Sequence, residues 1–202
     1  REEGFSPKKN QLMLNVGDVM LDATLFYQSF EKKPEWFKTG KEFVLATIHR
    51  AENTDDPIRL MNIIEALNEI NSNVPVILPI HPRTREVIER SSLKLDFATY
   101  QPVGYFEMIY LLKRCSYVLS DSGGVQKESY FHQKQCLILR DETEWTELVD
   151  SGFNILVGAD KDMIIDHSKK LNDVNLIFRG DLYGTGDTSS RIVEALQQYS
   201  ER

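Results

Sequence analysis

The turn Ser120-Asp121-Ser122-Gly123-Gly124 combines residue types that bind a phosphate. It leads into residues 124–132, which have the pattern of a helix. A helix that begins at two glycines exposes unpaired backbone N–H groups with no Cβ atoms in front of them, and its positive dipole end attracts an anion. Ser122 serves there either as the helix cap or as an extra hydroxyl donor. The turn therefore predicts a phosphate site, and a capped helix start without a ligand is the alternative.

Glu128 adds a carboxylate to the same helix, four residues after Gly124. Residues four apart in a helix share one face, so this carboxylate and the bare glycine are expected to lie on the same side. A carboxylate in that place can accept hydrogen bonds from the two hydroxyls of a ribose. The combination favours a nucleoside diphosphate over free phosphate as the ligand.

Basic residues follow the other predicted strands, where the ligand site of an open parallel sheet lies. His49 and Arg50 come after the first strand with Glu52 close behind, which places two possible cations beside a carboxylate in a loop. We interpret His49 and Arg50 as functional for that reason. His81, after the second strand, is equally well explained as a turn residue held by the backbone. These side chains are expected to converge with the Gly123-Gly124 turn on one edge of the sheet.

The elements that must position these residues alternate regularly along the chain. Short β-rich runs occur at residues 43–48, 76–80, 97–103, 117–120, 136–139 and 154–157. Helical patterns occupy a stretch that begins at Asp56-Pro57, residues 84–90, 106–114, 143–150 and 163–171, and two further stretches at 19–30 and 190–199. Gly152 is placed to end one of the helices. Such alternation predicts an α/β fold, a Rossmann-like parallel sheet with helices on both faces.

Composition excludes several classes of function. The formal net charge of −7 argues against a nucleic-acid binder, because affinity for phosphate backbones comes from clustered Lys and Arg. Cys115 and Cys136 lie in apolar runs without a CxxC spacing, so they are expected to be buried free thiols in a reducing cytoplasm. No apolar run reaches the length of a membrane span. The histidines lack zinc-site spacing, and Ser122 is not in a G-x-S-x-G elbow, so neither a metal nor a serine hydrolase is expected.

Several motifs, taken in order, identify a family. They are Thr47-Ile48-His49-Arg50-Ala51-Glu52-Asn53, Pro79-Ile80-His81-Pro82-Arg83-Thr84, residues 120–128, Leu139-Arg140-Asp141-Glu142-Thr143-Glu144, residues 152–158, Tyr183-Gly184-Thr185-Gly186-Asp187 and Arg191-Ile192-Val193-Glu194. With these motifs the chain resembles, over nearly its whole length, the C-terminal domain of the non-hydrolysing UDP-N-acetylglucosamine 2-epimerases.

The resemblance implies one half of a glycosyltransferase-B-type two-domain fold with UDP in the cleft. Residues 1–40 are then expected to be a connecting segment and remnant of the N-terminal domain, residues 41–178 the UDP-binding Rossmann-like domain, and residues 179–202 a Gly-rich turn and helix that pack toward the missing domain. The family positions that match His49, Ser122, Gly123, Gly124 and Glu128 contact UDP. In some bacterial members the positions that match Arg50 and His81 bind a second UDP-sugar, an allosteric activator.

The resemblance also implies a mechanism. Members of the family eliminate UDP to form a glycal and add it back with C2 inverted, and their main catalytic carboxylates lie in the N-terminal domain. We therefore expect His49 to be the catalytic residue of this half, and we expect the isolated chain to bind UDP weakly without turnover. No cofactor is implied. The full-length protein is expected to be a cytoplasmic homodimer that supplies sugars for polysaccharide biosynthesis.

Two departures from the family pattern leave the substrate open. Trp145-Thr146 stands where many members have Arg-Pro, and Met108 stands where many have an aromatic residue that stacks on uracil. The Thr143-Glu144-Trp145 form is more similar to members that act on UDP-2,3-diacetamido-2,3-dideoxyglucuronate than to those acting on UDP-N-acetylglucosamine. A retaining glycosyltransferase of the same architecture and a nucleotide-sugar sensor without catalysis are the alternative functions.

Overall fold

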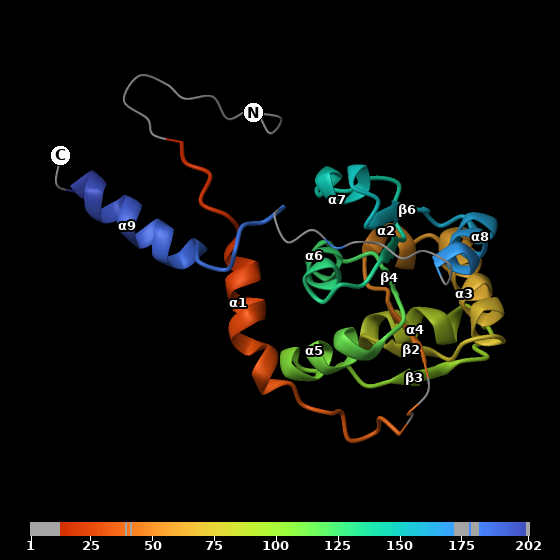
Figure 1. Ribbon diagram of the computed structural model, residues 1–202. Helices are drawn as coiled ribbons and strands as arrows, with labels where there is room; N and C mark the ends of the chain where they lie inside the picture. The colour runs from red at the N-terminus through yellow and green to blue at the C-terminus, as the bar shows by residue number, and fades with distance from the viewer. Residues whose placement is uncertain (1–12, 39, 41, 172–177, 179–181, 201–202) are drawn as a thin grey trace. The chain divides into compact units, whose positions relative to one another are not determined.

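The computed structural model describes residues 13–38, 40, 42–171, 178 and 182–200 (Figure 1). The chain divides into two compact units. The larger unit covers residues 27–179 and contains the sheet. The smaller unit joins residues 1–26 to residues 180–202.

The larger unit is built on a six-stranded sheet in the order β3-β2-β1-β4-β5-β6, and every pair of neighbours is parallel. The strands are β1 (Val44–Thr47), β2 (Val76–Pro79), β3 (Ala98–Tyr100), β4 (Val118–Ser120), β5 (Cys136–Ile138) and β6 (Asn154–Leu156). All six predicted strands are confirmed. The third was expected to run to residue 103, but it ends at Tyr100 because Pro102 has no N–H to continue the ladder.

Strand β1 is the point where the strand order reverses. The chain passes from β1 to β2 and β3 on one side, and then crosses back to place β4 on the other side of β1. Thr47 at the end of β1 therefore pairs with Ser120 at the end of β4, and their hydroxyl oxygens are 2.7 Å apart. Ligands of such sheets bind in the crevice at this reversal, so the loops after β1 and β4 are the ones to examine.

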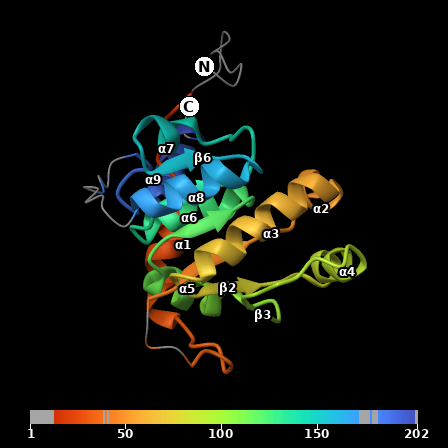
Figure 2. The ribbon, with the colours of Figure 1, turned by 90° about the vertical axis from the view of Figure 1, so that its right-hand side faces the viewer.

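Helices cover both faces of the sheet, as predicted (Figures 1 and 2). Val44 and Ala46 of β1 point toward helices α3 (Pro57–Asn71) and α8 (Lys161–Leu171), whereas Leu45 points toward α5 (Tyr105–Arg114). The alternation follows from the two-residue period of a strand, and both faces are apolar because both are buried. The helices of this unit are α2 (Ala51–Thr54), α3 (Pro57–Asn71), α4 (Pro82–Arg90), α5 (Tyr105–Arg114), α6 (Gly123–Phe131), α7 (Thr146–Asp150) and α8 (Lys161–Leu171).

Local chemistry sets where these helices begin and end. Asp56 caps α3, since its side chain accepts from the amides of Ile58 and Arg59, and Gly152 follows the end of α7 with a φ of 77°. Both predictions are confirmed. The helix expected at residues 143–150 starts only at Thr146, because the Thr143 hydroxyl accepts from the Trp145 amide and holds a turn there. The four-residue helix α2 was not predicted.

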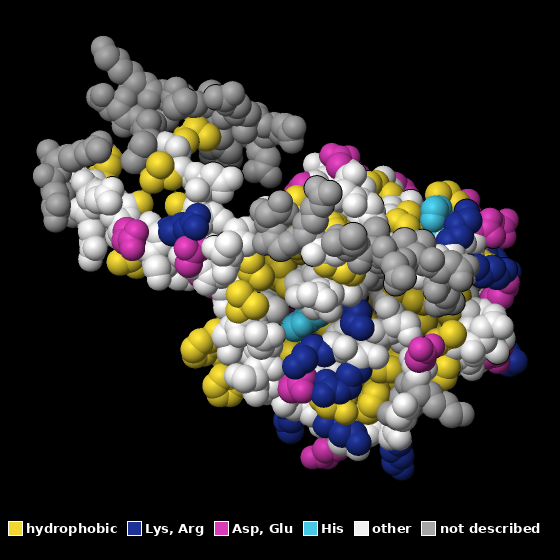
Figure 3. All heavy atoms as spheres, viewed as in Figure 1, with side chains coloured by type: hydrophobic (Ala, Val, Ile, Leu, Met, Phe, Trp, Pro, Cys, Tyr) yellow, Lys and Arg dark blue, Asp and Glu magenta, His cyan; other side chains and the backbone are white. Residues whose placement is uncertain are grey.

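A connecting stretch is fastened to α5 at the start of the larger unit. After the 3-10 helix η1 (Gln28–Phe30), the Glu31 carboxylate accepts from both terminal nitrogens of Arg114, at 2.8 and 2.9 Å, and pairs with Lys113 at 3.0 Å. The hydrogen bond from Arg114 and these two positive charges lower the pKa of Glu31 to about 2. Figure 3 shows Lys and Arg side chains gathered beside acidic ones over α5.

The smaller unit contains most of α1 (Val19–Tyr27) and all of α9 (Thr188–Ser200), both predicted from the sequence. The Asp22 carboxylate accepts from the backbone amides of Thr188 and Ser189, so it caps α9 from α1. Gly17, with a φ of 98°, lies against Thr188, where a Cβ would meet the hydroxyl oxygen at 2.4 Å. Residues 179–181, at the start of the predicted Gly-rich stretch, lie outside the described residues.

No helix in the described part of the chain has the length and apolar character that crossing a membrane requires.

Candidate functional site

The carboxylate of Asp121 joins the loop after β1 to the loop after β4. It is fully buried and accepts from the backbone amides of His49, at 3.0 and 3.1 Å, and of Arg50, at 2.9 Å. The Asn53 amide group of α2 also donates to it, at 3.2 Å, and donates to the carbonyl of Leu139 beyond β5 at 2.8 Å. Asp121 thus ties the loop after β4 to the loop after β1, and Asn53 extends the network to the backbone after β5. The loops after these three strands are therefore held in a fixed arrangement.

The start of α6 leaves free backbone donors. The first amide of α6 with a partner is that of Gln126, which donates to the Ser122 carbonyl at 3.1 Å. Within the described chain, the amides of Gly123 and Gly124 have no hydrogen-bond partner. Ser122 occupies the N-cap position but its side chain makes no capping hydrogen bond, which leaves the hydroxyl for a ligand. Three potential donors therefore converge at this helix end.

The two glycines have different surroundings. A Cβ on Gly124 would have nothing closer than the Ser122 hydroxyl at 4.0 Å, so that side of the turn is open. A Cβ on Gly123 would lie 3.5 Å from Trp145 Nε1, 3.6 Å from a Glu144 oxygen and 3.9 Å from Arg50 Nη2. The Arg50 guanidinium thus lies beside the free amides, as expected for a group that binds the same anion.

Glu128 lies one turn further along α6 and is partly buried. Burial raises the pKa of its carboxyl to about 7. No described residue donates a hydrogen bond to the Glu128 carboxyl. A partly buried carboxyl with free acceptors on the face of the bare glycine suits a ligand that brings its own hydroxyl donors.

His81 is less closely associated with the site. It occupies the N-cap position of α4, where its Nδ1 accepts from the Arg83 amide at 3.3 Å. The next residues are held nearby, because the Thr84 hydroxyl donates to the Ile48 carbonyl at 3.0 Å and Arg83 pairs with Asp55. The structure therefore places His81 at the turn into α4, and no described contact links its ring to His49.

Arg140, the basic residue after β5, is fully engaged. Its side chain is 6% exposed and donates to Glu52 at 3.0 Å and to both oxygens of Glu144 at 3.0 and 2.9 Å. Burial alone would lower the pKa of Arg140, but these two carboxylates outweigh it and raise the pKa. Arg50, in contrast, makes no hydrogen bond through its guanidinium to any described residue. The Arg50 guanidinium therefore remains available to a ligand.

Trp145 supports the glycine turn from the side of the β5 loop. Its indole Nε1 donates to the Gly123 carbonyl at 2.9 Å, and the Lys127 ammonium lies 4.2 Å from the centre of its rings. The sequence identified Trp145 only as a departure from a family pattern, and it gave no function to Asp121 or Asn53. Contacts to backbone amides and carbonyls leave no pattern in residue type, so these three residues were missed.

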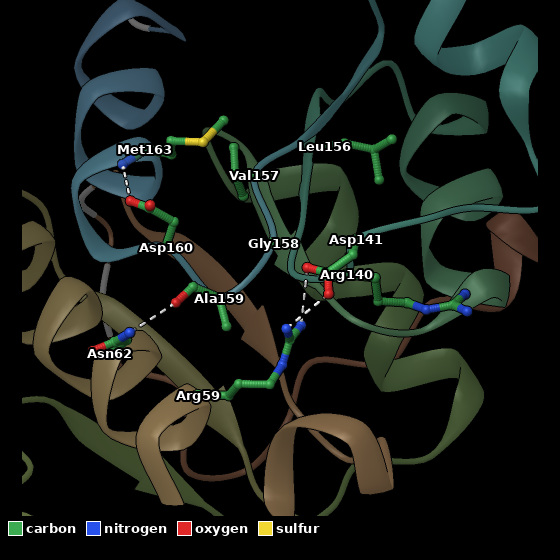
Figure 4. A pocket seen from close by; sticks show the side chains of 10 residues that line it. All are labelled: Arg59, Asn62, Arg140, Asp141, Leu156, Val157, Gly158, Ala159, Asp160 and Met163. Atoms are coloured by element: carbon green, nitrogen blue, oxygen red, sulfur yellow. Dashed lines mark hydrogen bonds and ion pairs between the residues drawn. The ribbon is translucent and has the colours of Figure 1, made fainter. Parts of the chain in front are cut away.

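A separate pocket of about 520 Å³ lies on the other side of β5, toward α3 and α8 (Figure 4). The polar groups that line it form hydrogen bonds with one another. Arg59 donates to both oxygens of Asp141, Asn62 donates to the Ala159 carbonyl, and Asp160 accepts from the Met163 amide at the start of α8. The pocket is lined by Arg59, Asn62, Arg140, Asp141, Leu156, Val157, Gly158, Ala159, Asp160 and Met163. It therefore offers a ligand fewer free polar groups than the start of α6 does.

The chain matches the family model for UDP-N-acetylglucosamine 2-epimerase over residues 1–197. It is 53% identical over 197 residues to the UDP-2,3-diacetamido-2,3-dideoxy-D-glucuronate 2-epimerase of Pseudomonas aeruginosa, a match that covers 97% of this chain and 55% of that protein. A UDP-N-acetylglucosamine 2-epimerase homolog from Methanococcus maripaludis is 44% identical over 200 residues, with 93% and 55% covered.

A solved structure shares the fold. Methanocaldococcus jannaschii UDP-GlcNAc 2-epimerase, in complex with UDP-GlcNAc and UDP, superposes with a TM-score of 0.84 at 34% identity, over 98% of this chain and 57% of that one. The chain thus spans a little more than half the length of each of these proteins.

Proposed function

The chain belongs to the UDP-N-acetylglucosamine 2-epimerase family, and we propose that it is the UDP-binding half of a UDP-sugar 2-epimerase. The family resemblance stated from the sequence is therefore confirmed. The proposal for this half is carried by one observation: the free amide of Gly123 lies beside the Arg50 guanidinium, and Asp121 of the same turn holds the backbone of His49 and Arg50. The complete enzyme would join this half to a second domain in a glycosyltransferase-B-type fold.

Each site residue has a role in this proposal. The amides of Gly123 and Gly124 and the hydroxyl of Ser122 bind the diphosphate, and Arg50 supplies a positive charge beside it. Glu128 accepts from the ribose hydroxyls. His49 acts on the phosphate next to the sugar. His81 and Arg50 would also belong to a second, regulatory UDP-sugar site, for which the position of Arg50 beside Gly123 is the support.

The reaction requires this half to stabilise a leaving group. During elimination a base removes the C2 proton, the C1–O bond breaks, and UDP departs with the electron pair to leave a glycal. UDP then re-forms the C1–O bond while a proton is delivered to the opposite face of C2, which inverts that centre. Negative charge grows on the departing phosphate, so donors fixed in advance around it stabilise the transition state more than the bound sugar nucleotide. The groups that move the C2 proton would come from the other domain.

The substrate we propose is UDP-2,3-diacetamido-2,3-dideoxyglucuronate. Support comes from the 53% identity to the Pseudomonas aeruginosa protein of that name and from Trp145, which shapes the wall of the site beside Gly123. UDP-N-acetylglucosamine, bound in the Methanocaldococcus jannaschii structure, is the competing substrate. We further propose a cytoplasmic homodimer for the complete protein, a location consistent with two buried free cysteines.

Calorimetric titration of UDP into the chain and into Gly124→Ala tests the diphosphate site. The added methyl group comes no closer than 4.0 Å to the Ser122 hydroxyl but stands in front of the amides, so we expect affinity to fall about tenfold or more without loss of thermal stability. Gly40→Ala is the matched control, because a Cβ there meets no atom within 4 Å. Equal affinities for UDP in the two variants would refute the proposed site.

A further inference from the structure

His49 is held twice by the same carboxylate. Its backbone amide donates to Asp121 at 3.0 Å, and its ring Nδ1 lies 3.3 Å from Asp121 Oδ1. The Asp121 side chain is completely buried, whereas that of His49 is 48% exposed. One edge of the imidazole is therefore fixed against the protein while the rest of the ring reaches toward the surface.

The chemistry of the carboxylate decides which nitrogen carries the proton. An ionised carboxylate only accepts hydrogen bonds, so an Nδ1 lone pair at this distance would be repelled and an Nδ1–H would be attracted. In a neutral imidazole only one nitrogen carries the proton, and its identity is set by the partner of the other. Among the described residues, no Lys or Arg side chain pairs with Asp121 to weaken this preference.

We infer that Asp121 is a positioning residue that fixes His49 in the Nδ1–H form and turns Nε2 toward the ligand. Helix α6 begins two residues after Asp121, so the same residue also sets the distance between the His49 ring and the free amides of Gly123 and Gly124. That Nε2, once it carries a proton, donates a hydrogen bond to a diphosphate rests on the proposed function. The tautomer of the neutral ring in the ligand-free chain does not.

Asn53 completes the arrangement. Its amide nitrogen donates to Asp121 Oδ2 and its oxygen accepts from Arg59 Nε at 3.1 Å, which orients the amide. Oδ2 also receives the amides of His49 and Arg50. The carboxylate therefore has little freedom to rotate, and Oδ1 remains directed at the imidazole.

The most direct test is the ¹⁵N spectrum of the histidine rings in the ligand-free chain at a pH where His49 is neutral. Signals of His49 are assigned by their loss in His49→Gln. A proton on Nδ1 and a bare Nε2 are expected. The opposite tautomer, which free imidazole side chains in water favour, would overturn the inference. This measurement needs no substitution at Asp121 and no UDP.

Variants then test what the positioning does. Asp121→Asn is expected to lose the Nδ1–H signature and to bind UDP about tenfold more weakly. The double variant Asp121→Asn, His49→Gln should bind UDP as tightly as His49→Gln alone. Asp150→Asn, the same change at an exposed residue of α7, is the control and should keep the signature. Additive losses in the double variant would show that Asp121 does not act through His49. Should Asp121→Asn fail to fold, the spectrum of the unchanged chain still decides.

The two proposals fail in different ways. If the chain does not bind UDP but shows the Nδ1–H signal, the proposed function is wrong and the positioning by Asp121 stands. If UDP binds and the proton is on Nε2, the positioning by Asp121 is wrong and the proposed function stands.

Discussion

Glu128 combines a raised pKa with free acceptor oxygens, and this makes binding sensitive to pH. Its carboxyl has a pKa of about 7 because it is buried. Ribose hydroxyls donate to the ionised form, so the ligand must displace the proton from a protonated Glu128 before it gains these hydrogen bonds.

We therefore predict that the affinity for a UDP-sugar rises as the pH increases through 7. A nucleotide sugar is suited to this measurement because its diphosphate diester stays ionised throughout. Between pH 8 and pH 6 the affinity should fall up to about tenfold, and Glu128→Gln should bind weakly with little dependence on pH. An affinity of the unchanged chain that does not vary with pH would show that Glu128 does not bind the ribose.

Trp145 acts on the glycine turn through a single hydrogen bond. Trp145→Phe keeps an aromatic ring over Lys127 but removes the Nε1 donor to the Gly123 carbonyl. We predict a loss of UDP affinity of about threefold to tenfold, since one neutral hydrogen bond contributes about 1 kcal/mol. Calorimetry measures it, and Trp36→Phe is the control at a tryptophan that stacks on Tyr100. Unchanged affinity in Trp145→Phe would mean that the turn is held by the backbone alone.

At the scale of residues, the sequence predicted the groups that point toward a ligand better than the groups that hold them. Gly123 and Gly124 were identified because bare glycines at a helix start leave a pattern. Asp121 lies within the same turn, yet its function depends on amides 71 and 72 residues away in sequence. Residue type alone carries no information on such a contact.

At the scale of elements, Glu31 fastens the connecting stretch to α5. The pKa of about 2 in the folded chain lies below the 4.5 of an unperturbed glutamate. The stabilisation is thus present above pH 4.5 and is lost as the pH falls from 4.5 toward 2. Both basic partners reach solvent, so screening limits its size.

We predict that Glu31→Gln lowers the free energy of unfolding by about 1 kcal/mol at pH 7 and by much less near pH 2, where the Glu31 carboxyl is about half protonated. Denaturant unfolding across that range measures the difference. Glu142→Gln removes a charge from an exposed loop residue and serves as the control. A Glu31→Gln effect that persists unchanged at pH 2 would point to packing in place of the ion pair.

The strands were predictable because they are short, apolar and bounded by turn residues, and the sheet order then follows from few alternatives. Helix starts were harder. Helix α2 has four residues and no hydrophobic period, and α7 begins late because Thr143 bonds to Gln126 and Trp145 instead of continuing a helix. Short elements of this kind are set by side-chain contacts that only the folded chain provides.

At the scale of the whole molecule, α9 carries more apolar surface than its own unit covers. Val193, Leu196 and Tyr199 are 53%, 64% and 60% exposed. The chain spans a little more than half the length of its relatives, and we propose that this face packs on the other half of the complete enzyme.

From this division we predict that the 202-residue chain binds UDP but does not epimerise a UDP-sugar. The reason is that the acids and bases for the C2 proton are assigned to the other half. Proton NMR in deuterated water reports the exchange of the C2 hydrogen directly, and an epimerase of the same family that retains both halves is the positive control. Exchange at C2 catalysed by this chain alone would contradict the assignment.

A crystal structure of the chain with UDP would show directly where the diphosphate binds. We expect both phosphates within about 3 Å of the amides of Gly123 and Gly124, with His49 Nε2 facing them and Glu128 at the ribose. Phosphates found elsewhere, for example in the pocket beside Arg59 and Asp141, would contradict this expectation.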